Sequence, residues 1–290
     1  MPKNRDLTIK TTAGVFAARD YGGAGRDILF VHGTGHNLEV WAPLAEALRN
    51  KFHLAAFDMR GHGQTPENSV SPEQYWRDIG PVVEALGLKK PLLVGHSTGG
   101  YAVTAYAASG GDCSGIVILD GFVLDSRKTP EEAKAWHLPK EQLWEMFRYG
   151  WQAEEAQKEE YVAEICSKAA GDWLNDGISS ALISDFTRKS FLRSGRTWLR
   201  RPTMEEIAIV GYPDPVAEIY PSADIYDKVN IPAAFVFAAK GLYGDRRNDL
   251  ERVVSGKKNR IFVPIESSHN LHMLKPAEVA AAILKLAGTL

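Results

Sequence analysis

The sequence has few cysteines, almost no net charge and no long apolar run, and each of these absences excludes a class of protein. Cys113 and Cys166 are the only cysteines in 290 residues, too few for a disulfide framework or a cysteine-based metal cluster. The formal net charge of -2 gives no electrostatic reason to bind nucleic acid or an anionic membrane. The polar start MPKNRDLTIK has no signal-peptide core and no segment is long enough to span a bilayer, so we expect a cytoplasmic protein.

The chain alternates short apolar runs with longer stretches that have helical spacing. Runs such as DILFVH (27–32) are continuously apolar, as strands covered on both faces are. Helical periodicity follows many of them, for example over 37–50 and 98–109. This order predicts an α/β fold with a mostly parallel sheet and helices on both of its faces. Eight segments are predicted as strands: LTIKTT, VFAARDYG, 27–32, 52–58, 91–96, 115–120, 231–239 and 260–265.

The alternation stops after the sixth predicted strand. From about 122 to 226 the pattern is mostly helical, and no strand run there is as strong as those before it. After that stretch, strands and helices alternate again. We therefore predict an α/β core made of 1–121 and 227–290, interrupted by a helical insertion of 122–226.

The motif LLVGHSTGG at 92–100 places Ser97 between a predicted strand and a predicted helix. A strand that turns at once into a helix needs a sharp, strained turn. The residues next to that turn must be small, because a Cβ there would collide with the strand or the helix. Gly95, Gly99 and Gly100 meet that requirement. The first N–H groups of the helix would also point at anything bound beside the serine. The motif predicts that Ser97 is a nucleophile; the alternative is an idle serine in a glycine-rich turn.

A serine nucleophile needs a base, an acid that orients the base, and donors for the oxyanion. His269 is the predicted base, because it follows the last predicted strand at the edge where open α/β sheets place their sites. The predicted oxyanion donors are the backbone N–H groups of Thr98, at the helix start, and Thr34, in the loop HGTGHN. His96 is interpreted as a packing or pocket residue beside Ser97, and His272 as a packed or solvated loop histidine.

Four segments in this order and spacing, LFVHGTGHNLEVW, AFDMRGHGQT, LLVGHSTGG and ESSHNLHMLKP, resemble the α/β-hydrolase family. The resemblance covers nearly the whole predicted core. It implies that the insertion of 122–226 is the variable cap domain of that family, placed after the sixth strand of an eight-stranded sheet.

The position of the triad acid departs from the commonest arrangement of the family. The resemblance implies an aspartate after the strand that follows the cap, but Gly241 stands there. A second family arrangement takes the acid from the end of the strand before the cap, where this sequence has Asp120. Because triads are defined by geometry and not by chain order, we predict Asp120 as the acid, with Asp245 as the alternative.

The predicted cap is rich in tryptophan, which suggests an enclosed apolar pocket for a small hydrophobic molecule, aromatic ones included. Trp136, Trp144 and Trp151 are the candidate substrate contacts. The alternative is that these side chains pack between cap helices.

Together these residues predict a serine hydrolase that cleaves an ester, lactone or activated amide through an acyl-enzyme, with no metal ion or organic cofactor. Two other functions stay open. One is a cofactor-independent dioxygenase in which the pair His269–Asp120 deprotonates the substrate. The other is a non-catalytic small-molecule receptor on the same fold. Dehalogenase and epoxide hydrolase chemistry is argued against, because it needs an aspartate where Ser97 stands.

Overall fold

Eight strands form one sheet in the computed structural model, which describes residues 4–135 and 137–290. The strand order is β1-β2-β4-β3-β5-β6-β10-β11, and every pair from β4 to β11 is parallel while β2 runs antiparallel to both of its neighbours. This confirms the predicted α/β class and the mostly parallel sheet. The strands are β1 Arg5–Thr11, β2 Gly14–Gly22, β3 Arg26–Val31, β4 Phe52–Phe57, β5 Leu92–His96, β6 Gly115–Leu119, β10 Ala233–Lys240 and β11 Arg260–Ser268.

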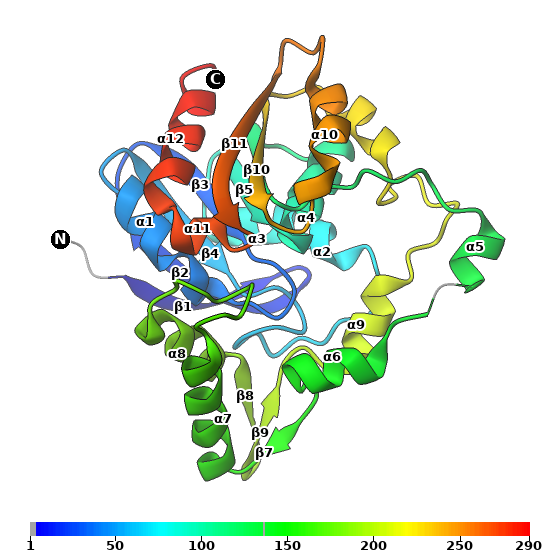
Figure 1. Cartoon of the computed structure of the whole chain (residues 1–290). Coiled ribbons are helices and arrows are strands. Elements are labelled where there is room, and N and C mark those ends of the chain that lie inside the picture. The colour runs from blue at the N-terminus through cyan, green and yellow to red at the C-terminus, as the bar shows by residue number, and fades with distance from the viewer. Residues whose placement is uncertain (1–3, 136) are drawn as a thin grey trace.

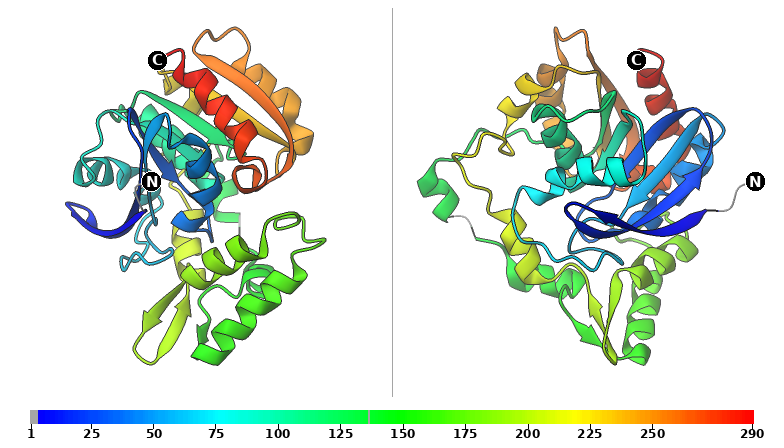
Figure 2. Two further views of the ribbon diagram at one scale, coloured as in Figure 1. Left: turned by 90° about the vertical axis from the view of Figure 1, so that its left-hand side faces the viewer. Right: turned by 180° about the vertical axis from the view of Figure 1, so that it is seen from behind.

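Two layers of helices cover the sheet, and the alternation of side chains along the strands explains why (Figures 1 and 2). In β3, Ile28 and Phe30 belong to one apolar cluster, whereas Leu29 and Val31 belong to the other. Helices α1 (Ala42–Leu48) and α12 (Pro276–Ala287) contribute to the first cluster. Helices α3 (Ile79–Ala85), α4 (Thr98–Ala108) and α10 (Arg247–Val254) contribute to the second. The inner parallel strands β3, β5, β6 and β10 are therefore buried on both faces, whereas the edge strand β11 is only half-buried.

The stretch 71–88, which has one helical pattern, folds as two short helices, α2 (Gln74–Arg77) and α3. Pro81 lies in the first turn of α3 and has no N–H to donate to the carbonyl of Arg77. The interruption therefore follows from the sequence itself. Four further short helices complete the core: η1 Leu38–Trp41, η2 Ala223–Lys228, η3 Gly244–Arg246 and α11 Leu271–Leu274.

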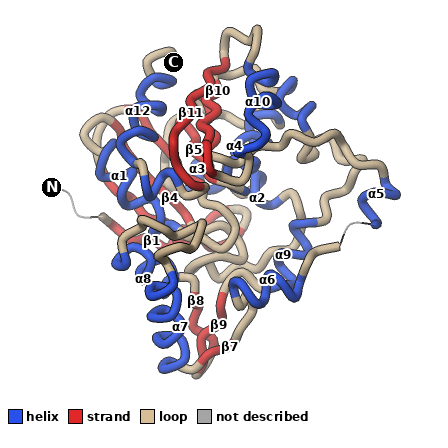
Figure 3. The backbone as a smooth tube through the Cα atoms, viewed as in Figure 1, coloured by secondary structure: helices blue, strands red, loops and turns tan. Residues whose placement is uncertain are grey.

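The segment between β6 and η2 lies below and to the right of the sheet in Figure 1, and its described residues form five helices, as expected for a helical cap inserted after the sixth strand. It also carries a small antiparallel sheet, β7-β9-β8, that the sequence pattern did not predict (Figure 3). These strands are two to four residues long, too short for a clear alternating pattern. The elements are α5 Pro130–Ala135, α6 Lys140–Phe147, β7 Gln152–Ala153, α7 Glu155–Lys168, α8 Ser180–Lys189, β8 Phe191–Ser194, β9 Thr197–Arg200 and α9 Met204–Gly211.

Polar contacts join the cap to loops of the core. The buried Arg201 donates to the carbonyl oxygens of Gly61 and Thr65, both at 3.2 Å, and pairs with Glu206 at 2.9 Å. Asn37 donates to the carbonyl of Phe186 at 2.7 Å. Because buried donors that lose their acceptors are costly, these contacts hold the cap at a fixed place over the sheet. Within the described residues, no helix is both long and apolar enough to cross a membrane.

Candidate active site

Ser97 stands at the tip of a strained turn between β5 and α4, with φ of 53° and ψ of -123°. The turn is possible because its neighbours lack side chains. A Cβ on Gly99 would lie 2.1 Å from the carbonyl oxygen of Val31, and one on Gly95 would lie 2.1 Å from the carbonyl oxygen of Gly99. The sequence pattern around Ser97 therefore has a steric cause, as expected for a nucleophile elbow.

Replacing Gly99 with alanine is expected to lower the free energy of unfolding by about 3 kcal/mol, because the new methyl group meets backbone and not a movable side chain. The measurement is the midpoint of urea denaturation of each variant, and an unchanged m value shows that the midpoint shift reports stability. Gly80→Ala is the matched control: the nearest atom to its Cβ is 3.5 Å away, on Tyr106. Equal losses of stability in the two variants would contradict the steric account of the turn.

His269 and Asp120 form a buried pair beside the elbow. Asp120 follows β6 and His269 follows β11, and the two meet because β10 alone separates these strands in the sheet. The Nδ1 atom of His269 lies 2.7 Å from Oδ2 of Asp120, and the side chains are 6% and 0% exposed. The carboxylate also accepts the backbone N–H of Leu242 at 3.0 Å. Since the carboxylate accepts a hydrogen bond from the Nδ1–H group, the Nε2 atom of His269 carries the lone pair of a base.

The alternative acid, Asp245, is not part of this pair. It lies exposed in η3, and among the described residues no hydrogen bond connects it to His269. Gly241 occupies the position where the commonest family arrangement has the acid, and a Cβ there would lie 2.2 Å from Oδ2 of Asp120. The Asp120 carboxylate therefore fills the space beside residue 241.

Ser97 and His269 line the same cavity, although between the described residues no direct hydrogen bond joins the serine hydroxyl to the imidazole. Hydrogen bonds between catalytic groups are often long before substrate binds, so this geometry is compatible with proton transfer once a substrate is in place.

Thr34 and Thr98 lie on two sides of Ser97 and are joined by a hydrogen bond of 2.7 Å between their Oγ1 atoms. A Cβ on Gly33 would lie 2.8 Å from the Cβ of Ser97, so the loop that carries Thr34 passes directly over the elbow. Within the described chain, the backbone N–H groups of both threonines have no acceptor. They remain available for an oxyanion.

Two cavities meet at Ser97 and Thr34. The larger one, of about 1020 Å³, extends along α4, the start of the cap and α9, where Tyr101, Phe122 and Val210 line it. The smaller one, of about 570 Å³, extends between His269 and the cap, where Leu143 and Phe186 line it. A substrate at Ser97 therefore has room for a group on each side of the bond to be cleaved.

The tryptophans predicted as substrate contacts lie elsewhere. Trp144 is 44% exposed, and Trp151 packs edge-on against Tyr161 and Phe191, so neither lines the two cavities. Trp136 lies outside the described residues. Trp173, which the sequence reasoning missed, lines the smaller cavity with its ring centroid 6.4 Å from that of His269. The sequence signal that could have identified Trp173 is its position in the loop AAGDWLNDG, because binding residues often lie on loops.

Comparison with known proteins identifies the family of this chain. A model of the alpha/beta hydrolase family matches residues 28–282. The putative carbamate hydrolase RutD of Caulobacter segnis is 31% identical over 123 residues, which are 40% of this chain and 46% of that protein. The bifunctional esterase/perhydrolase DCH of Acinetobacter calcoaceticus is 33% identical over 106 residues, which are 35% of this chain and 38% of that protein. The chain thus spans less than half the length of these two curated relatives.

Solved structures match over the full length at lower identity. The crystal structure of E-2-(acetamidomethylene)succinate hydrolase has a TM-score of 0.72 at 18% identity, covering 98% of this chain and 99% of that one. An esterase from Thermogutta terrifontis has a TM-score of 0.69 at 20% identity, with 98% of each chain covered. At these identities the likeness shows the fold. Because the family model matches nearly all of the sequence, this chain belongs to the alpha/beta hydrolase family.

Proposed function

We propose that this protein is a serine hydrolase that cleaves an ester, lactone or activated amide bond of a small hydrophobic molecule. One observation carries the proposal: the 2.7 Å bond between His269 and Asp120 lies beside a serine held in a strained turn. A buried imidazole oriented by a carboxylate is the base that a serine needs in order to attack a carbonyl.

The reaction has two steps in this proposal. The Oγ of Ser97 attacks the carbonyl carbon while Nε2 of His269 takes its proton, and the backbone N–H groups of Thr34 and Thr98 hold the oxyanion. His269 then protonates the leaving alcohol or amine, which leaves an acyl-enzyme on Ser97. Water, deprotonated by His269, attacks the acyl carbon; the bond to Oγ of Ser97 breaks, His269 returns the proton to that oxygen, and the acid is released. Asp120 stabilises the imidazolium in both steps.

The relatives and the cavities support this class of substrate. Two relatives have names that refer to carbamate and ester cleavage, which are both acyl transfers to water. The two cavities at Ser97 are lined largely by apolar groups, which favours hydrophobic substituents on both sides of the cleaved bond.

A fluorophosphonate probe tests the proposal, because it reacts with a serine only where a base and an oxyanion site activate it. We expect one probe per chain, on Ser97 when located by mass spectrometry, and no labelling of Ser97→Ala. Labelling at other serines only, or none, would count against the mechanism. Oxygen uptake during turnover would indicate a dioxygenase. Thermal stabilisation by ester or lactone ligands without any turnover would indicate a receptor.

A further inference from the structure

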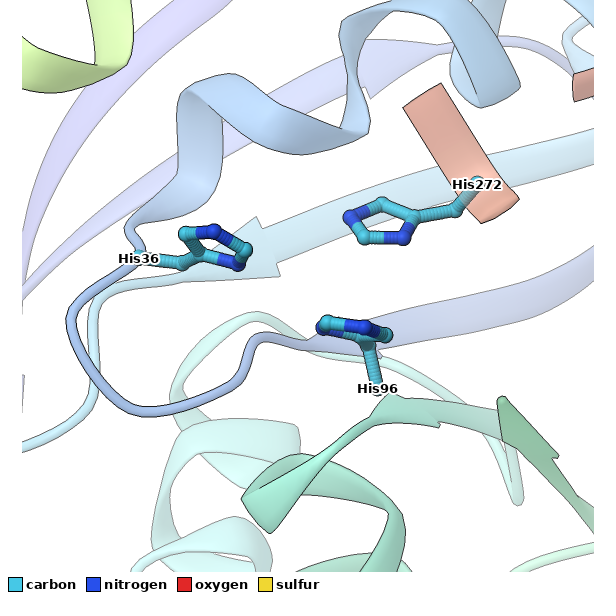
Figure 4. Close-up of side chains that lie close together, drawn as sticks. All are labelled: His36, His96 and His272. Carbon is cyan, nitrogen blue, oxygen red and sulfur yellow. The ribbon is translucent and has the colours of Figure 1, made fainter. Parts of the chain in front are cut away.

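Three histidines that the proposed hydrolysis does not use gather behind the candidate active site. His36 lies in the loop between β3 and η1, His96 ends β5, and His272 lies in α11. One ring nitrogen from each can be chosen so that all three lie within 4.8 Å of one another. In Figure 4 the three rings surround a common space, each coming from a different element. From the sequence, His96 is a packing or pocket residue and His272 a loop histidine; neither is predicted as a ligand.

The nitrogens of this cluster lack partners. Within the described residues, both ring nitrogens of His272 and the Nδ1 atoms of His36 and His96 are buried without a hydrogen bond. Nearby His32 behaves differently: its Nδ1 lies 2.8 Å from the carbonyl oxygen of Gly33, and its Nε2 accepts the backbone N–H of Met59 at 3.0 Å. Buried polar groups are nearly always bonded, so four unpaired nitrogens in one place indicate that something binds between the rings.

The hydrogen bonding of His96 selects the tautomer that a metal ion needs. Its Nε2 atom lies 3.1 Å from the carbonyl oxygen of His269, which can only accept, so Nε2 carries the hydrogen. The lone pair is then on Nδ1, which is buried and has no hydrogen-bond partner among the described residues. In metal sites, the ring nitrogen of a ligand histidine that does not bind the metal usually donates a hydrogen bond, often to a backbone carbonyl. Burial also keeps all three rings neutral by lowering their pKa values.

The geometry points to a site for one divalent transition-metal ion of the Zn²⁺ type, held by one nitrogen each from His36, His96 and His272. Imidazole is a preferred ligand of such ions, and three histidines leave a fourth position for water. That position can face the smaller cavity, which His36 and His96 line. Nitrogens around tetrahedral zinc are about 3.4 Å apart. The ring nitrogens must therefore approach one another by up to about 1.4 Å on binding. The half-buried His36 lies on a loop, which has the freedom to move.

The proposed site is coupled to the base of the proposed reaction but does not depend on that reaction. The ring of His96 lies 4.5 Å from that of His269, centroid to centroid, and its Nε2 binds the His269 backbone. The proposed site therefore adjoins His269, with the three histidines as its ligands.

The test is a titration of the chelator-treated, full-length protein with Zn²⁺ by calorimetry, and with Co²⁺ by visible absorption. We expect one ion per chain, with an intense Co²⁺ spectrum typical of tetrahedral nitrogen ligands. His36→Gln and His272→Gln are each expected to weaken binding by about 100-fold. His53→Gln is the matched control, because the ring of His53 pairs with Asp27 at 2.7 Å and is not in the cluster. Circular dichroism of the metal-free variants checks that they fold.

Loss of binding in the two cluster variants, with retention in His53→Gln, supports the site. Absence of saturable binding by the folded protein, unchanged binding in both cluster variants, or equal loss in the control would overturn it. His36→Gln gives the result even if His272→Gln fails to fold, because His36 lies on a loop at the cavity and not in the packed core. Ser97→Ala is expected to bind the ion normally, which separates this proposal from the hydrolase proposal.

Discussion

Ser97→Ala is expected to lower kcat for ester hydrolysis by at least about 10⁴-fold while leaving the fold intact. In the proposed reaction, Ser97 forms the bond to the carbonyl carbon. In the variant a water molecule would have to attack instead, without the fixed position of the serine oxygen and without forming an acyl-enzyme. Alanine keeps the Cβ at the strained φ of 53°, so the turn loses only a hydroxyl. The measurement is initial rates on chromogenic esters of increasing acyl length, with thermal unfolding of the same samples.

Ser109→Ala is the control for this variant. Ser109 follows α4, and its hydroxyl donates to the carbonyl oxygen of Tyr106, outside both cavities at the active site. The kcat of Ser109→Ala is expected to stay within about twofold of the kcat of the unmodified protein, which corresponds to about 0.4 kcal/mol of activation free energy. Substantial esterase activity in folded Ser97→Ala would rule out the acyl-enzyme and favour a mechanism in which His269 activates water or a substrate hydroxyl.

Asp120→Asn is expected to lower kcat by about 10³- to 10⁴-fold at neutral pH. The Oδ2 atom of Asp120 accepts hydrogen bonds from both the N–H of Leu242 and Nδ1 of His269. An asparagine oxygen in that place can keep both bonds but carries no negative charge. It therefore no longer stabilises the imidazolium that forms when His269 takes the proton of Ser97. The measurement is the pH dependence of kcat on the same esters.

Asp245→Asn separates the two candidate acids. Asp245 is exposed in η3, so this variant should keep nearly full activity. The opposite result, a large loss in Asp245→Asn and little in Asp120→Asn, would show that the loop after β10 rearranges to supply the acid. It would also contradict the role given to the buried His269–Asp120 pair.

The core and the pair His269–Asp120 could be predicted because the relevant signals are local and steric. Continuous apolar runs identify strands buried on both faces, and their carboxyl ends must share one edge of the sheet. Asp120 and His269 each follow such a strand, so their meeting follows from strand order. The glycines around Ser97 indicate a turn in which any Cβ would meet backbone.

The cap was less predictable because its side chains are positioned by tertiary packing. Trp151 and Trp144 have similar sequence surroundings, yet one packs in a small aromatic cluster and the other is exposed. Trp173 reaches the smaller cavity only because its loop folds back toward His269. No periodic pattern encodes that approach. The histidine cluster was missed for the same reason, since its members are far apart in the chain.

The contact between residue 241 and Asp120 means that only one of the two positions can carry the acid in the present arrangement. An aspartate at position 241 would bring its Cβ within 2.2 Å of the existing carboxylate oxygen, and a second buried negative charge would follow. Gly241 and Asp120 are therefore a matched pair: an acid at position 241 requires the side chain of residue 120 to move away or to be replaced.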